Sequence, residues 1–159
     1  MRAALVLLVG LSTTAAAAGD WPQILGPQRN GIAQEETLAA AWPSGGPPEL
    51  WQRDVGGGFA GVAVAGNTAV LFHRIGDSLV TEALDPATGR QRWRMEFPTN
   101  YRGGISADSG PRCVPLIDRQ RVVVYGPGGE MQCAELATGK KLWFRNLLEE
   151  FDAPEGYFG

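Results

Sequence analysis

A glycine-rich stretch, two cysteines and one histidine are the residues of this sequence whose types and spacing come closest to known chemical sites. Gly56–Gly61 fits the pattern G-x-G-x-x-G, which holds a dinucleotide when it follows a strand and opens a helix. The next residues, 62–67, are instead typical of a strand that runs into a turn. We therefore interpret these glycines as a tight bend before a strand and not as a nucleotide site.

The cysteines and the histidine also fail to form a recognisable site. On the strand assignment given below, Cys113 and Cys133 lie about 9.5 Å apart on the first and third strands of one sheet. A disulfide spans at most roughly 7 Å between Cα atoms, so we expect two buried free thiols. His73, the only histidine, has no serine or cysteine nucleophile nearby, and we interpret it as a solvated residue at a strand end. The sequence thus indicates no catalytic, cofactor-binding or metal-binding residue.

The composition is that of a turn-rich globular protein. Of 159 residues, 22 are glycine and 11 are proline, while 44% are hydrophobic and 19% are charged. Glycine without a collagen period, together with this many apolar residues, excludes collagen, a disordered chain and a helical bundle. The formal net charge is −3 with no basic cluster, so nucleic acid is not an expected partner. We expect short strands joined by tight turns.

The N-terminus has the pattern of a secretory signal peptide. Met1 and Arg2 precede an apolar stretch over residues 3–11, and three alanines at 16–18 form a cleavage pattern before Gly19. The stretch is shorter than the roughly 20 residues of a membrane-spanning helix. We expect cleavage after residue 18, a periplasmic or secreted protein, and no transmembrane segment after cleavage.

A repeat organises the rest of the chain. Residues 83–93 and 133–143 share alanine, threonine, glycine, a cation and tryptophan in the same register. The motif residues are Ala83, Asp85, Ala87, Thr88, Gly89 and Trp93 in the first copy, and Ala137, Thr138, Gly139 and Trp143 in the second.

Each copy reads as four short antiparallel strands, which we assign in the second copy to residues 113–117, 121–125, 130–135 and 140–145. Residues 85–89, Asp-Pro-Ala-Thr-Gly, predict the turn between the third and fourth strands: aspartate accepts backbone hydrogen bonds, proline fixes φ and glycine takes the left-handed conformation. The tryptophan then lies in the fourth strand and packs between neighbouring sheets. Such repeats predict an all-β fold, a β-propeller. A single β-sandwich with two similar hairpins is the alternative.

The motif A-x-D-x-x-T-G-x-x-x-W, complete at 83–93 and weakened at 133–143, resembles the tryptophan-docking motif of bacterial PQQ-like β-propeller repeat proteins. In the second copy Glu135 replaces the aspartate and Cys133 replaces the first alanine. The resemblance covers roughly residues 20–159. It implies four-stranded antiparallel blades, of which this sequence would supply about two of an eight-bladed ring. As an N-terminal fragment, it would have the missing C-terminal blades of the same protein as partners.

Members of this family differ in function. Some resemble quinoprotein dehydrogenases, which hold pyrroloquinoline quinone (PQQ) and calcium in the central channel and oxidise alcohols or sugars. Others resemble a propeller subunit that assists outer-membrane-protein assembly, or exported propellers that act as binding platforms. The sequence lacks the adjacent cysteine pair of many alcohol dehydrogenases of the group. We expect no cofactor in this chain, with PQQ and calcium possible only in a complete protein.

The repeat predicts a division of the chain. The expected segments are a signal peptide (1–18), an N-terminal extension (19–47), a strand with Trp51 in the tryptophan position that completes the last blade (48–55), a first blade (62–94), an inter-blade loop (95–112), a second blade (113–145) and the start of a connection (146–159).

Because strand directions alternate, the loops between the second and third strands lie at the same end of the ring as the loops that lead from a fourth strand to the next blade. Long loops on a rigid scaffold often bind ligands or partners. The candidate ligand-binding residues there are His73, Arg74, Tyr101, Arg102 and Arg112. An arginine suits a carboxylate or phosphate, although an arginine that holds its own loop is the structural alternative. We expect a binding or scaffold module of the cell envelope, with a protein or small-molecule partner. The alternatives are part of a PQQ-dependent alcohol or sugar dehydrogenase, and a scaffold for outer-membrane-protein assembly.

Overall fold

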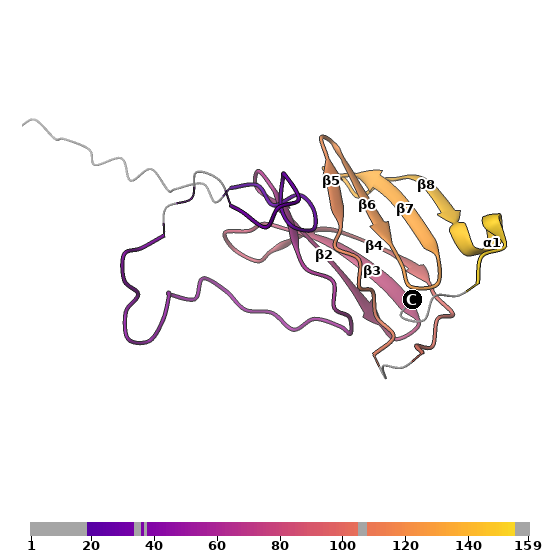
Figure 1. Cartoon of the computed structure of the whole chain (residues 1–159), viewed down its shortest axis with the longest axis horizontal. Coiled ribbons are helices and arrows are strands. Elements are labelled where there is room, and N and C mark those ends of the chain that lie inside the picture. Colours follow the sequence, from indigo (N-terminus) through magenta and orange to yellow (C-terminus); the bar gives the residue numbers. More distant parts are fainter. Residues whose placement is uncertain (1–18, 34–35, 37, 105–107, 155–159) are drawn as a thin grey trace, which may run out of the picture.

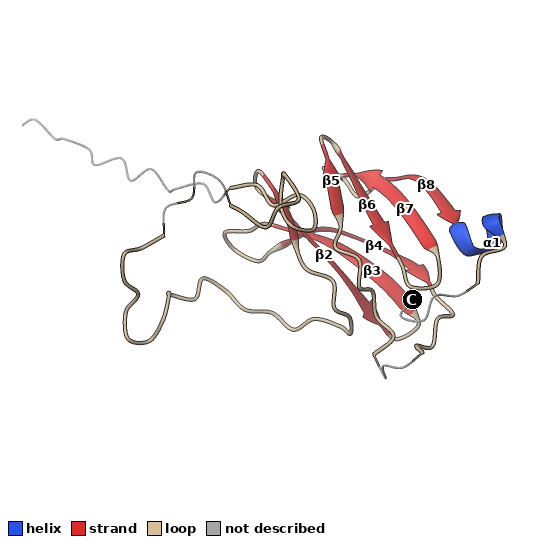
Figure 2. Ribbon diagram, in the orientation of Figure 1, coloured by secondary structure: helices blue, strands red, loops and turns tan. Residues whose placement is uncertain are grey.

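Two four-stranded antiparallel sheets form the structure, a computed structural model that describes residues 19–33, 36, 38–104 and 108–154 (Figures 1 and 2). The first sheet contains β1 (Ala63–Ala65), β2 (Thr68–Ile75), β3 (Ser78–Leu84) and β4 (Gln91–Pro98). The second contains β5 (Leu116–Asp118), β6 (Arg121–Tyr125), β7 (Glu130–Glu135) and β8 (Lys141–Asn146), and α1 (Leu147–Phe151) follows. Strand order equals chain order in both sheets, as in propeller blades.

The hydrophobic core lies between the two sheets. Phe72, Leu79 and Trp93 of the first sheet pack with Val122 and Val124 of the second, and all five side chains are buried. Alternate residues of each strand face this core because side chains alternate across a sheet. The packing of one four-stranded sheet face to face on the next agrees with the blades predicted from the repeat.

The turn between the third and fourth strands of each sheet forms as predicted. The Asp85 carboxylate accepts hydrogen bonds from the backbone N–H groups of Ala87 and Thr88 at 3.0 and 3.1 Å. Gly89 and Gly139 take the left-handed conformation, with φ of 67° and 71°. A β-bulge follows in each sheet, where the pairing register shifts. The two turns are therefore equivalent in structure as well as in sequence.

Each of two tryptophans docks on the turn of the sheet that follows it. Trp93 of β4 donates its indole N–H to the backbone oxygen of Leu136 at 2.7 Å, and its ring covers Gly139. Trp51 donates in the same way to Pro86 at 2.8 Å and covers Gly89. The repeat thus joins neighbouring units in series.

Residues 48–55 form no strand in the structure. That they complete the last blade stays a prediction, because the strands of such a blade are not among the described residues. The side chains of Trp51 and Arg53 donate hydrogen bonds to Pro86 and Glu82. Gly57, two residues beyond the segment, forms an isolated bridge to Arg74.

Other strand boundaries also differ from prediction. β4 continues to Pro98, paired with Ser78, so the first sheet extends beyond the predicted end at residue 94. β5 begins at Leu116 and not at Cys113. β6 and β7 begin and end at the predicted residues. The segment 1–18, predicted to be a signal peptide, lies outside the described residues.

Candidate functional site

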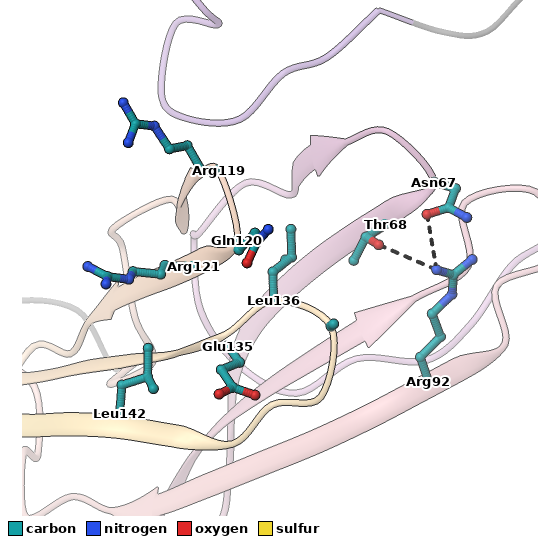
Figure 3. Close-up of a pocket in the computed structure, with 10 residues that line it drawn as sticks. Asn67, Thr68, Arg92, Arg119, Gln120, Arg121, Glu135, Leu136 and Leu142 are labelled. Carbon is teal, nitrogen blue, oxygen red and sulfur yellow. Dashed lines mark hydrogen bonds between the residues drawn. The ribbon is translucent and has the colours of Figure 1, made fainter.

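A cleft of about 520 Å³ opens between the two sheets at the end where β1 turns into β2 and β5 into β6 (Figure 3). Both sheets line it. The lining side chains that Figure 3 labels are Asn67, Thr68 and Arg92 of the first sheet, and Arg119, Gln120, Arg121, Glu135, Leu136 and Leu142 of the second.

One wall of this cleft is held by Arg92. Its guanidinium donates hydrogen bonds to the Asp85 carboxylate at 2.8 Å, and to the side-chain oxygens of Asn67 and Thr68 at 3.2 and 3.4 Å. The hydrogen bond from Arg92 is the main reason that the pKa of Asp85 lies below its usual value. This arginine is therefore a fixed part of the wall.

The opposite wall contains the β5–β6 turn, residues 118–121. Arg119 has φ of 54°, a left-handed conformation that is uncommon for a residue other than glycine. The same turn position of the first sheet is occupied by Gly66, with φ of 53°. Arg119 and Arg121 are both exposed, and their side chains extend outward from the cleft (Figure 3).

The predicted binding end of the sheets lies opposite this cleft, and there Arg74 has a structural role. It is 8% exposed and donates to the backbone oxygens of Gly76 (2.7 Å), Tyr101 (2.5 Å) and Ser109 (3.1 Å). Tyr101 is itself buried. Arg74 therefore ties the β2–β3 turn to the loop that connects the two sheets.

Arg102 and Arg112 lie near the same end, each in local contacts. Arg102 donates to the exposed Asp77 carboxylate at 2.6 Å, and this hydrogen bond lowers the pKa of Asp77. Arg112 donates to the backbone oxygens of Gly110 and Asp108, both at 3.2 Å, and its guanidinium lies 5.5 Å from the centroid of the Phe59 ring. The structure thus brings Arg74, Tyr101 and Arg102 together, while Arg112 holds its own loop.

The interpretation of His73 as a solvated residue is wrong. His73 lies within β2 and is 4% exposed, because the segment 48–57 covers this face of the sheet. Its Nδ1 accepts the backbone N–H of Gly56 at 2.7 Å, which leaves the ring proton on Nε2, 3.3 Å from the buried Glu82 carboxylate. Arg53 donates to the same carboxylate at 2.8 Å. This buried polar cluster fastens the segment to the sheet.

The pKa of His73 predicts a pH dependence of stability. Burial lowers the pKa below 6.5, and the nearby Glu82 carboxylate only partly opposes this effect. The unfolded chain therefore binds a proton more readily, and the free energy of unfolding should fall as the pH drops below about 6.5, by at most about 1.4 kcal/mol per pH unit. Urea titrations of the protein and of His73→Gln between pH 7 and 5.5 measure this, and equal slopes would contradict the lowered pKa.

The cysteines are free, but only one of them is buried. Cys133 lies in β7, and burial raises the pKa of its thiol. Cys113 was predicted to be buried in the first strand of its sheet; it is exposed, because β5 begins three residues later and leaves it in the preceding loop.

In the ranges 19–33, 36, 38–104 and 108–154, no three His, Cys, Asp or Glu side chains gather in a group that could hold a metal ion. Within the same ranges, no helix combines the length and apolar character of a membrane span.

The cleft between the sheets was not predicted from the sequence. A signal for it was present, since Arg119, Gln120 and Arg121 stand where the first copy has Gly66, Asn67 and Thr68. Alignment of the two turns would have shown two cations at one of them. That these cations border a cleft depends on how the two sheets pack, which the spacing does not give.

Comparison with solved structures supports the fold. The chain resembles BamB from Moraxella catarrhalis, with 24% identity over 57% of this chain and 24% of the other, and a TM-score of 0.42. It resembles quinohemoprotein alcohol dehydrogenase from Comamonas testosteroni with 22% identity over 86% of this chain and 21% of the other, and a TM-score of 0.53. The matched region is thus about a quarter or less of the length of either structure. The second likeness supports a propeller fold and nothing more specific.

The family comparison covers most of the chain. Curated protein sequences give no match. The sequence model of the family described as outer membrane protein assembly factor BamB matches residues 34–154, which include both sheets. This chain therefore belongs to that family of PQQ-like β-propeller repeat proteins.

Proposed function

We propose that the chain is part of a non-catalytic β-propeller that binds other proteins of the cell envelope and supports the assembly of outer-membrane proteins. The observation that carries this proposal is the match of the outer membrane protein assembly factor BamB family to residues 34–154. The described structure agrees with a scaffold, since two blades pack in series through tryptophans that dock on turns.

The use of the reactive side chains also favours a scaffold. His73 and Glu82 are buried in the cluster that fastens residues 48–57, and Arg74 binds three backbone oxygens in two loops. These groups have structural partners, which leaves turns and the cleft between the sheets as the surfaces for recognition.

Deletion of the gene tests this proposal. We expect the amount of folded β-barrel proteins in the outer membrane to fall, because a scaffold for their assembly is lost, and to recover when the gene is restored. Gel mobility with and without heating separates folded from unfolded barrels, and a periplasmic protein serves as the control for general export. Unchanged amounts of folded barrels would rule the role out.

The alternative, part of a PQQ-dependent alcohol or sugar dehydrogenase, is tested with the complete protein. It is incubated with PQQ and calcium, and dye reduction with alcohols and sugars is measured. We expect no turnover, and sustained substrate-dependent dye reduction would overturn the non-catalytic proposal.

N-terminal sequencing of protein from the cell envelope tests export, with Gly19 as the expected first residue.

A further inference from the structure

We propose that the cleft between the two sheets binds an acidic segment of a partner protein, with an apolar side chain of that segment between the walls and its carboxylates at the arginines. This inference rests on the proposed function, because it assigns the scaffold's contact with a partner to one place on the blades. It lies at the opposite end of the sheets from the loops that the sequence pointed to.

The charges of the cleft favour an anionic ligand. Arg92 lines one side, and Arg119 and Arg121 stand at the rim of the other, with side chains that extend outward (Figure 3). In the part of the chain that the structure describes, Arg92 is paired with Asp85, whereas no carboxylate lies within salt-bridge distance of Arg119 or Arg121. The carboxylate of Glu135 accepts a hydrogen bond from the Thr138 hydroxyl at 2.9 Å. Two cations at the rim are thus available to a ligand.

Apolar side chains lie between these charged walls. Leu136 is partly buried and Leu142 is 42% exposed, although leucine gains free energy from burial. Leu136 stands between Arg92 on one side and Arg119 and Arg121 on the other (Figure 3). An inorganic anion would leave this apolar surface in water. A peptide that carries an apolar residue beside carboxylates satisfies both parts of the cleft.

The first sheet shows that the turn does not need these cations in order to fold. Gly66, Asn67 and Thr68 make the same connection between β1 and β2, and Gly66 has nearly the φ of Arg119. A left-handed arginine is less favourable than a left-handed glycine. The charge at residue 119 is therefore present in spite of the local backbone preference.

This equivalence supplies a variant that removes the charges without harming the turn. Arg119→Gly with Arg121→Thr copies the residues of the first sheet, and glycine suits the φ of 54°. The matched control is Arg90→Gln with Lys140→Gln, which removes two exposed cations from the turns between the third and fourth strands of both sheets. Both variants change the net charge by the same amount.

The experiment measures binding of a fluorescein-labelled, end-blocked peptide of alternating leucine and glutamate to the complete protein. A peptide of alternating leucine and glutamine reports the contribution of the carboxylates. Inorganic phosphate and phosphatidylglycerol vesicles are added as competitors. Fluorescence anisotropy is recorded at about 0.02 M and about 0.15 M salt, because screening weakens exposed charge pairs.

We expect the glutamate peptide to bind at least about tenfold more tightly than the glutamine peptide, and the Arg119→Gly, Arg121→Thr variant to lose that difference. The control variant should keep it, and both variants should keep the melting temperature. Equal binding of the glutamate peptide by the protein and the Arg119→Gly, Arg121→Thr variant would overturn the proposal. So would displacement of the peptide by phosphate or by vesicles at similar charge concentration.

The same variant separates this inference from the proposed function. Assembly of outer-membrane proteins could depend on the gene while the Arg119→Gly, Arg121→Thr variant still binds the peptide normally and supports assembly. In that case the scaffold role stands, and the cleft is not where the partner binds. If deletion leaves assembly unchanged, the scaffold role fails whatever the peptide does.

Discussion

Replacing Trp93 with alanine is expected to lower the free energy of unfolding by about 3–5 kcal/mol, the usual cost of removing a large aromatic side chain from a core. The ring is 9% exposed and packs between the two sheets, and its indole N–H donates to Leu136 at 2.7 Å. The truncation would leave a cavity between the sheets and an unpaired backbone oxygen. Urea denaturation followed by circular dichroism measures the loss.

Two control variants separate the contribution of burial from that of the indole hydrogen bond. Trp42 is 52% exposed, so Trp42→Ala should change stability by less than about 0.5 kcal/mol. Trp93→Phe keeps most of the ring but lacks the N–H donor, and should cost more than Trp42→Ala and less than Trp93→Ala. A loss of less than about 1 kcal/mol in Trp93→Ala would contradict the role of this tryptophan in joining the sheets.

Replacing Gly139 with alanine is the second large effect, an expected loss of about 2–5 kcal/mol. Gly139 has φ of 71°, which an alanine adopts at a cost, and a Cβ atom there would lie 2.7 Å from ring carbon Cδ2 of Trp93. The ring is fixed by its hydrogen bond and its packing, so it has little room to move. Denaturation of the variant measures the sum of both effects.

Gly66→Ala isolates the backbone part. Gly66 has φ of 53°, and no heavy atom of the described residues, its two chain neighbours aside, lies within 4 Å of the position of a Cβ. This variant should therefore lose only about 1–2 kcal/mol, the cost of the left-handed conformation. Equal losses in the two variants would mean that close packing of Trp93 on Gly139 adds nothing to stability.

The features that could be predicted from the sequence are local ones. Asp85 and Gly89 specify their turn through hydrogen bonds and φ values that involve neighbouring residues, and both are confirmed. The bounds of β6 and β7 were also predicted correctly, because turns delimit both strands. The fold followed from these local features once the repeat had shown that the same unit occurs twice.

Features that depend on distant segments were missed. The sequence predicts an exposed His73, because nothing near it in sequence shows that residues 48–57 cover it. The cleft was missed for a similar reason, since it exists only between two packed sheets.

The serial docking of tryptophans has a consequence for how stability is distributed along the chain. Each indole N–H reaches its acceptor within the next repeat, 35 residues away for Trp51 and 43 for Trp93. Energetic coupling is therefore strongest between neighbouring units, as in a one-dimensional array. A loss of stability in one unit reaches distant units only through each interface in turn. Contacts of this range also form without closing long loops, so each unit can gain structure on the one before it as the chain is synthesised.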